Sequence, residues 1–287
     1  MENNNKKISF LIGAGFSEPM GYPLGEKMNK NIKSVDISIL DHILTTVEYE
    51  QAFANMQKMK RFFLKEYDGE FDYELFYDYI CNTELFKKIV NPNAQKYTNE
   101  QHQVKLLYQG IVAYNIKDDQ NRQFYDNTLQ EGQYKDFLDV IAYLQEKYEI
   151  KFHTLNHDLF LEGLLNKRNI PYCDGFEKLN SPYYGKTYNK KIGKLIMSNL
   201  ERFTNNYTTK NQLFKIHGSI DYYLYYKEDI GYIPDKIIKT KQGVDISTFE
   251  RIENKDNRDK YPFCLNPYFL TGKDAKEEQY KNPILYS

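Results

Sequence analysis

Short apolar runs alternate with small or polar clusters along the chain, and they predict buried β-strands that end in turns. The first run, residues 8–12, is followed at once by Gly13-Ala14-Gly15. A continuous apolar run of this length is typical of a strand buried on both faces, as in a parallel sheet. Residues 149–154 and 213–216 have the same character. Residues 222–226 and 261–265 are further strand candidates, and the polar stretch 230–260 shows no regular period.

Apolar positions recur at helical spacing between the first and second predicted strands. Phe71 and Leu75, for example, lie four residues apart within a longer series of this kind. This spacing places apolar side chains on one face of a helix. We therefore expect a discontinuous α/β domain over 1–34 and 149–287, interrupted by a helical insertion over 35–148.

The composition argues against several classes of protein. The chain has 39 Lys and Arg against 40 Asp and Glu, so its formal net charge is −1. Attachment to nucleic acid or to an anionic membrane through bulk charge is therefore not expected. No apolar run approaches the ~20 residues that a membrane span needs, and the N-terminus lacks the apolar core of a signal peptide. We expect a cytoplasmic protein.

The cysteines and histidines do not have the spacing of metal ligands. Cys81, Cys173 and Cys264 lie far apart, whereas a zinc ribbon needs two close cysteine pairs. An odd number of cysteines also argues against a disulfide framework. His153 and His157 are four residues apart, but we expect the end of a strand between them. The sequence therefore predicts no metal site.

Three of the predicted strands end in clusters of residues that can bind a ligand. The clusters are Gly13-Ala14-Gly15-Phe16-Ser17, Thr154-Leu155-Asn156-His157-Asp158 and His217-Gly218-Ser219. In open α/β sheets, ligands bind at the carboxyl ends of the parallel strands. We therefore expect the three clusters to meet at one edge of the sheet.

The glycine turn has features of a phosphate site. Gly13 and Gly15 leave backbone amides open to an anion, and Ser17 can cap a helix that starts there. The turn lacks the third glycine of a dinucleotide-binding motif, because Pro19 and Met20 occupy that region. A tight strand-to-helix turn without any ligand is the alternative interpretation.

The other two clusters supply groups that can act on a sugar or on water. The Asn156 amide both donates and accepts hydrogen bonds, so it can hold a water or a ribose hydroxyl. Asp158 can accept hydrogen bonds from the same sugar, or it can cap the N-terminus of the following helix. His217, beside the small Gly218, can take a proton near neutral pH. A structural asparagine and a structural histidine remain the alternatives.

These clusters, in this order, resemble motifs of the sirtuin superfamily, and above all of the sirtuin-like domains in bacterial antiphage defence proteins. The family's first NAD-binding loop resembles G-A-G-F-S together with the nearby G-Y-P-L. The family's T-x-N-[YH]-D motif resembles T-L-N-H-D, and the motif that contains its catalytic histidine resembles K-I-H-G-S. The resemblance implies catalysis by Asn156 and His217. The NAD-binding residues that it implies are Gly13, Ala14, Gly15, Phe16, Ser17, Pro23, Thr154, Asp158, Gly218 and Ser219.

The resemblance implies a Rossmann-like parallel sheet and an NAD glycohydrolase. Such an enzyme cleaves NAD to nicotinamide and ADP-ribose or a cyclic isomer, needs no metal, and would deplete NAD in antiphage defence. Deacylating sirtuins have a four-cysteine zinc module and a glutamine where this chain has Leu155, and both differences point away from deacylation. The alternatives are a noncatalytic NAD or ADP-ribose sensor, a zinc-free deacylase or ADP-ribosyltransferase, and a dehydrogenase.

The resemblance also predicts that the sheet is incomplete. Family members continue beyond the position of Ser287 into two more strands. We therefore expect a fragment, a naturally shortened form, or a site that another chain completes. Relatives imply a homo-oligomer or a partner such as a P-loop ATPase, whereas a membrane or direct nucleic-acid partner is not expected.

Overall fold

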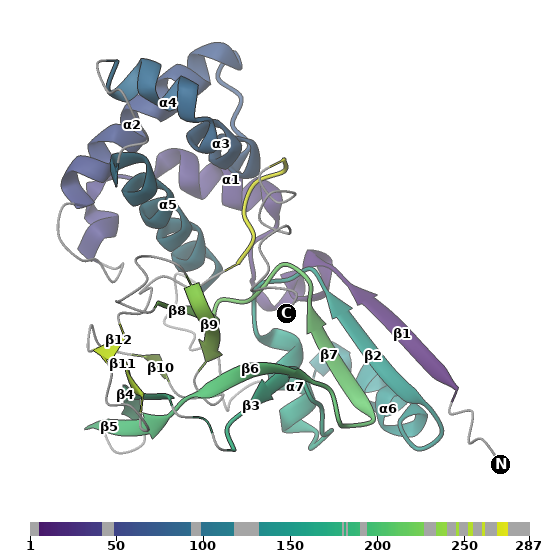
Figure 1. Ribbon diagram of the computed structural model, residues 1–287. Helices are drawn as coiled ribbons and strands as arrows, with labels where there is room; N and C mark the ends of the chain where they lie inside the picture. The colour runs from purple at the N-terminus through teal and green to yellow at the C-terminus, as the bar shows by residue number, and fades with distance from the viewer. Residues whose placement is uncertain are drawn as a thin grey trace.

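A computed structural model gives the arrangement of most of the chain. It describes residues 6–41, 49–92, 99–117, 132–179, 181, 183–189, 194–226, 234–239, 245–246, 252–254, 260–261 and 269–274. These residues form a mixed α/β structure with a small parallel sheet, two antiparallel sheets and a cluster of helices (Figure 1). None of the helices in these ranges is both long enough and apolar enough to cross a bilayer.

The parallel sheet contains the three strands that the apolar runs predict. They are β1 (Lys7–Ile12), β2 (Glu149–Thr154) and β7 (Asn211–Lys215). The sheet order is β1-β2-β7, so β2 is the central strand. Ile12 is paired with Thr154, and Thr154 with Lys215, so the three carboxyl ends are level with one another. The α/β class and the parallel direction of these strands are confirmed.

One face of this sheet is buried and the other is more open. Ile150, Phe152 and Leu213 are fully buried on the face that packs against α6 (Lys135–Leu144) and α7 (Phe160–Lys167). On the opposite face, Lys151 and His153 are only half-buried and Leu11 is 73% exposed. The expectation that the first strand is buried on both faces is therefore wrong.

Five helices pack together around a second hydrophobic core. They are α1 (Gly25–Ser34), α2 (Tyr49–Glu66), α3 (Tyr73–Cys81), α4 (Thr83–Val90) and α5 (Asn99–Lys117). Met59, Phe76 and Tyr108 lie fully buried in this core. Its limits differ from the predicted insertion over 35–148, since α1 belongs to this core while α6 belongs to the core under the sheet.

The region between β2 and the C-terminus contains antiparallel strands, most of which the sequence did not indicate. The strand candidate 222–226 is confirmed as β8 (Tyr223–Tyr226), and the candidate 261–265 overlaps β12 (Lys260–Tyr261). One sheet has the order β3-β6-β9-β8, formed by Gly175–Glu177, Glu201–Asn206, Pro234–Lys239 and Tyr223–Tyr226. The other contains β4 (Tyr183–Asn189), β5 (Lys194–Asn199), β10 (Asp245–Ile246), β11 (Ile252–Asn254) and β12 (Lys260–Tyr261). The polar stretch 230–260 is therefore not irregular throughout. Residues 262–265 lie outside the described ranges.

A buried ion pair joins the parallel sheet to α7. The Lys215 Nζ at the end of β7 lies 3.0 Å from Oε1 of Glu162, and the two side chains are only 2% and 7% exposed. The same ammonium group donates to the backbone carbonyl of Asp158, in the loop that precedes α7. Burial raises the pKa of Glu162 to about 7, and the positive charge of Lys215 limits that rise.

Replacing Lys215 with methionine should destabilise the fold in a pH-dependent way. Without the ammonium group, the pKa of Glu162 in the folded protein rises further above its value in the unfolded chain. The free energy of unfolding should then fall as the pH increases through this higher pKa. We expect a loss of about 3–5 kcal/mol at about pH 8 and a clearly smaller loss at about pH 5, measured by urea unfolding.

Lys87→Met is the matched control for this experiment. Lys87 forms an ion pair with Glu84 at 3.2 Å, but the Glu84 side chain is exposed. Loss of this exposed ion pair should change the free energy of unfolding by less than about 1 kcal/mol at either pH. An equal effect of Lys215→Met at both pH values would contradict the assigned role of Glu162.

Candidate functional site

The three strand-end clusters lie side by side at the carboxyl edge of the parallel sheet. The backbone N–H of Leu155 donates to the Ile12 carbonyl at 3.0 Å, and the N–H of Ile216 donates to the Thr154 carbonyl at 3.0 Å. The hydrogen-bonded ladder therefore continues one residue beyond each strand. It brings the Gly13 turn, the Asn156 loop and the His217 turn next to one another, as the sequence predicts.

Asn156 connects the central loop to the glycine turn. Its Nδ2 donates to the Gly13 carbonyl at 3.0 Å and to Ser17 Oγ at 2.9 Å. Its own backbone N–H donates to Thr154 Oγ1 at 3.0 Å. The side chain is nearly buried, at 9% exposure. Asn156 therefore fixes the relative position of two of the three clusters.

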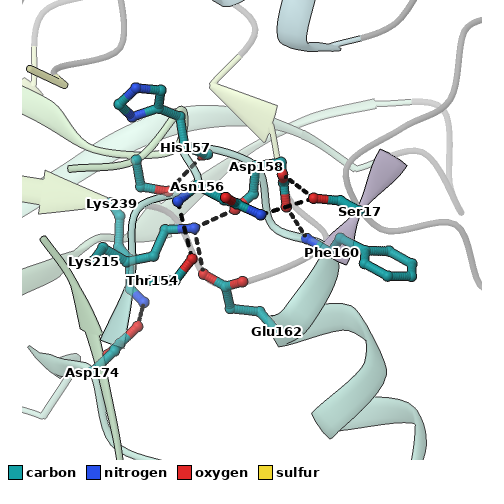
Figure 2. A network of polar contacts seen from close by, with 11 residues as sticks. Ser17, Thr154, Asn156, His157, Asp158, Phe160, Glu162, Asp174, Lys215 and Lys239 are labelled. Carbon is teal, nitrogen blue, oxygen red and sulfur yellow. Dashed lines mark hydrogen bonds and ion pairs between the residues drawn. The ribbon is translucent and has the colours of Figure 1, made fainter. Parts of the chain in front are cut away.

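Asp158 and Ser17 complete this network of polar contacts (Figure 2). Ser17 Oγ donates to Asp158 Oδ2 at 2.7 Å, and Asp158 Oδ1 accepts the backbone N–H of Phe160 at 3.0 Å. The carboxylate thus satisfies the N–H at the first residue of α7, which agrees with a capping role. All three side chains of the network, Ser17, Asn156 and Asp158, are buried.

The glycine turn differs from the one that the sequence predicts. β1 is followed by the short 3-10 helices η1 (Ala14–Phe16) and η2 (Glu18–Met20), and the first α-helix begins only at Gly25. Ser17 caps neither short helix with its side chain, because its hydroxyl bonds to Asp158 instead. The expectation that the Ser17 side chain caps a helix beginning there is therefore wrong, and the helix that does begin after Ser17 is a short 3-10 turn.

The backbone of the turn is nevertheless open. Gly13 and Gly15 are exposed, and a Cβ added at either position would meet no atom within 4 Å. Gly13 has φ −116°, a value that any residue can adopt, and its Cβ would also fit. Protein packing and backbone conformation therefore do not explain why Gly13 is a glycine.

Phe16 and Pro23 are both partly buried, and the Phe16 ring packs into the core. The Phe16 ring packs on Tyr134 and Phe137 at 5.1 and 5.2 Å between ring centroids, as part of the core below the sheet. Pro23 is half-buried in the segment that leads to α1. The structure thus gives Phe16 a packing role, in contrast to the ligand contact that the resemblance implies.

The third cluster presents His217 at the surface of a tight turn. His217 is half-exposed, and Gly218 has φ +77°, a left-handed conformation that favours glycine. Ser219 is buried, and its Oγ donates to the His157 carbonyl at 3.3 Å. The rings of His157 and His217 lie 6.0 Å apart. Ser219 therefore links the turn to the central loop, while the His217 side chain remains partly accessible.

A strap over residues 269–274 holds the His217 turn, and no pattern in the sequence predicts it. Leu270 N–H donates to the His217 carbonyl at 2.7 Å, and Phe269 forms an antiparallel bridge with Gly218. At its other end, the backbone N–H groups of residues 273 and 274 donate to Asp78 Oδ2 on α3, at 2.8 and 2.9 Å. The strap therefore connects the His217 turn to the helical cluster.

Lys215 and Glu162 are further residues that sequence reasoning missed. A lysine within an otherwise apolar strand and a glutamate on an apolar helix were the available signals, because such residues are buried only when paired. Within the described ranges, no group of three or more His, Cys, Asp or Glu side chains could hold a metal ion. Cys264 lies outside those ranges.

Comparison with models of known protein families gives no match, and comparison with curated protein sequences gives none. The likeness to sirtuins thus rests on the residues of the three clusters. The function of the site has to be argued from its geometry.

Replacing Asn156 with alanine should destabilise the protein as well as alter the site. The variant removes the amide that donates to Ser17 Oγ and to the Gly13 carbonyl, although this carbonyl keeps its hydrogen bond from the Phe16 N–H. We expect a loss of about 1–3 kcal/mol in urea unfolding. Asn166→Ala, at an exposed position of α7, is the matched control and should change the stability by less than about 0.5 kcal/mol. Equal stability of the two variants would contradict the bridging role.

Asp78→Ala should release the strap without unfolding the helical cluster. The variant removes the acceptor of two backbone N–H groups at the strap's end. We expect faster amide hydrogen exchange over residues 269–274 and at the His217 turn, measured by mass spectrometry. Asp136→Ala, on the exposed side of α6, should leave exchange in both segments unchanged. Unaltered exchange in Asp78→Ala would show that the strap is held by other contacts.

Proposed function

We propose that the protein is an NAD glycohydrolase that cleaves the bond between nicotinamide and ribose. The main support is the meeting of three clusters at the carboxyl ends of parallel strands, where the central Asn156 loop lies between the exposed glycine turn and the partly exposed His217. This is the edge at which open α/β sheets bind nucleotides. A Rossmann-like fold and a role in antiphage defence through NAD depletion rest in addition on the motif resemblance.

The open glycine turn fits the pyrophosphate of NAD. The exposed backbone at Gly13 and Gly15 has space where side chains would otherwise stand. Backbone amides in such a turn can approach an anion closely. Because Ser17 and Asp158 are bonded to each other, we assign them to holding the turn in place rather than to direct contact with NAD.

Two residues would share the chemical work at the ribose end. As nicotinamide leaves, positive charge develops on the ribose. Groups that stabilise this charge make the departure of nicotinamide easier. His217 would accept a proton from the attacking water or from a ribose hydroxyl, a contribution of about 10²–10⁴-fold in rate. Asn156 would position the loop beside the sugar, since its Nδ2 is already bound to Gly13 and Ser17.

His217→Ala tests this proposal. Because His217 is partly exposed, we expect the variant to remain folded while nicotinamide release falls by about 10²–10⁴-fold. His102→Gln, on α5 in the helical cluster, is the control and should retain wild-type activity. Nicotinamide release would be measured with and without lysate of phage-infected cells, since an enzyme of this kind needs a trigger. Full activity of His217→Ala would overturn the assignment.

A noncatalytic NAD or ADP-ribose sensor is the second candidate function. It is favoured by one observation: the Asn156 Nδ2 and both Asp158 carboxylate oxygens are already used in contacts within the protein. A sensor would bind NAD or ADP-ribose in calorimetry but release no nicotinamide under any triggering condition. Release of nicotinamide by the wild type, lost in His217→Ala, would exclude it.

A further inference from the structure

The strap over residues 269–274 is bonded to the helical cluster at one end and to the His217 turn at the other. In Figure 1 it is the yellow segment beside α3. Its middle is not a surface loop, because Leu270, Thr271 and Gly272 are buried. Closely packed interiors transmit strain, so a buried segment that is bonded at both ends relates the position of one end to that of the other. The position of α3 therefore affects the His217 turn.

Two carboxylates at α3 hold one end of the strap. Asp78 Oδ2 accepts the backbone N–H groups of Lys273 and Asp274, at 2.8 and 2.9 Å. The Lys273 ammonium group forms a 2.8 Å ion pair with Oδ2 of Asp72, whose other oxygen caps the N-terminus of α3. This ion pair is partly exposed and therefore contributes little, whereas hydrogen bonds from N–H groups to a carboxylate are strong. Asp78 is thus the main anchor of the strap on α3.

The peptide group between His217 and Gly218 is held from both sides. Its N–H, on Gly218, donates to the Lys215 carbonyl at 3.0 Å, and its C=O, on His217, accepts the Leu270 N–H at 2.7 Å. Gly218 has φ +77°, and a glycine can adopt other backbone conformations at little cost. The strap therefore supplies a contact that keeps this peptide, and with it the Cα–Cβ bond of His217, in one orientation.

Phe269 connects the same turn to the helical core. Its backbone forms an antiparallel bridge with Gly218, and its fully buried ring belongs to that core. The ring also lies 4.6 Å from the ring of His157, measured between centroids, and the His157 carbonyl accepts the Ser219 hydroxyl at 3.3 Å. The backbone of the turn is thus tied to the helices, while the His217 side chain remains half-exposed.

We propose that Asp78 is a positioning residue for His217: by anchoring the strap to α3, it fixes the peptide that follows His217 and thereby the direction of the imidazole. A general base must lie within about 2.6–3.2 Å of the atom that gives up its proton, and a displacement of about 1 Å caused far from the reacting atoms can lower the rate about 10²-fold. The catalytic consequence rests on the proposed function, whereas the control of the imidazole does not.

Three variants of the full chain test this role. Asp78→Ala removes the acceptor of two strap N–H groups, whereas Asp78→Asn retains a side-chain oxygen for them. Asp274→Pro removes one of the same hydrogen bonds from the side of the strap and leaves α3 unchanged. Glu84→Ala is the control, because this glutamate of the helical cluster has a side chain that is 87% exposed. Circular dichroism verifies folding, and Asp274→Pro decides the outcome if Asp78→Ala does not fold.

Two properties are measured: the NMR signal of the His217 imidazole at a fixed pH, assigned with His217→Ala, and the kcat and KM of nicotinamide release. We expect Asp78→Ala and Asp274→Pro to shift the imidazole signal and to lower kcat by about 10- to 100-fold. The KM for NAD should stay within about twofold, because the glycine turn is unchanged. Asp78→Asn and Glu84→Ala should match the wild type in both properties.

An imidazole signal at its wild-type position in folded Asp78→Ala would overturn the proposal, because a variant that had lost only stability would give that result. A shifted signal with the kcat of an active wild type would overturn it equally. A wild type that releases no nicotinamide under any trigger would instead contradict the proposed function, and the imidazole signal alone would then decide the role of Asp78.

Discussion

The candidate site depends on a lysine that is buried among groups of opposite charge. Lys215 lies at the end of β7. Its ammonium group is held by Glu162 on α7 and by the backbone carbonyl of Asp158, in the loop between β2 and α7. A buried charge is tolerated only when such partners compensate for its lost hydration. The strand that leads to His217 and the loop that contains Asn156 are therefore held in one arrangement. This arrangement is the condition for every other contact at the strand ends.

The polar residues of the site divide into those that build it and those that remain available to a ligand. Ser17, Asn156 and Asp158 are buried and hydrogen-bonded to one another. These contacts align the glycine turn with the Asn156 loop. The half-exposed His217 and the open backbone around Gly13 are left at the surface. Under the proposed function, this polar base would supply the preorganisation that electrostatic catalysis requires.

The parts of the fold that could be predicted from sequence are those with local signals. The segments 8–12 and 213–216 are mainly apolar, and 149–154 alternates apolar with polar residues. All three are short and followed by turn residues, so their strands and the meeting of their ends were predictable. The antiparallel strand Pro234–Lys239 was not, because its sequence is mixed and its stability comes from pairing with distant strands. The roles of Phe16 and Ser17 were also missed, because a ring in the core and a hydroxyl bound to Asp158 depend on contacts far along the chain.

The helical cluster and the site are mechanically connected, although the sequence suggests an insertion with its own core. Leu159, Ile220 and Phe269 belong to the helical core, and each adjoins a strand-end cluster in sequence or in space. Through Leu270, the strap bonds to the carbonyl of His217 itself, while its other end is bound to Asp78 on α3. Packed cores shift between discrete arrangements rather than deforming continuously. A displacement of α3 would therefore act directly on the turn that presents His217.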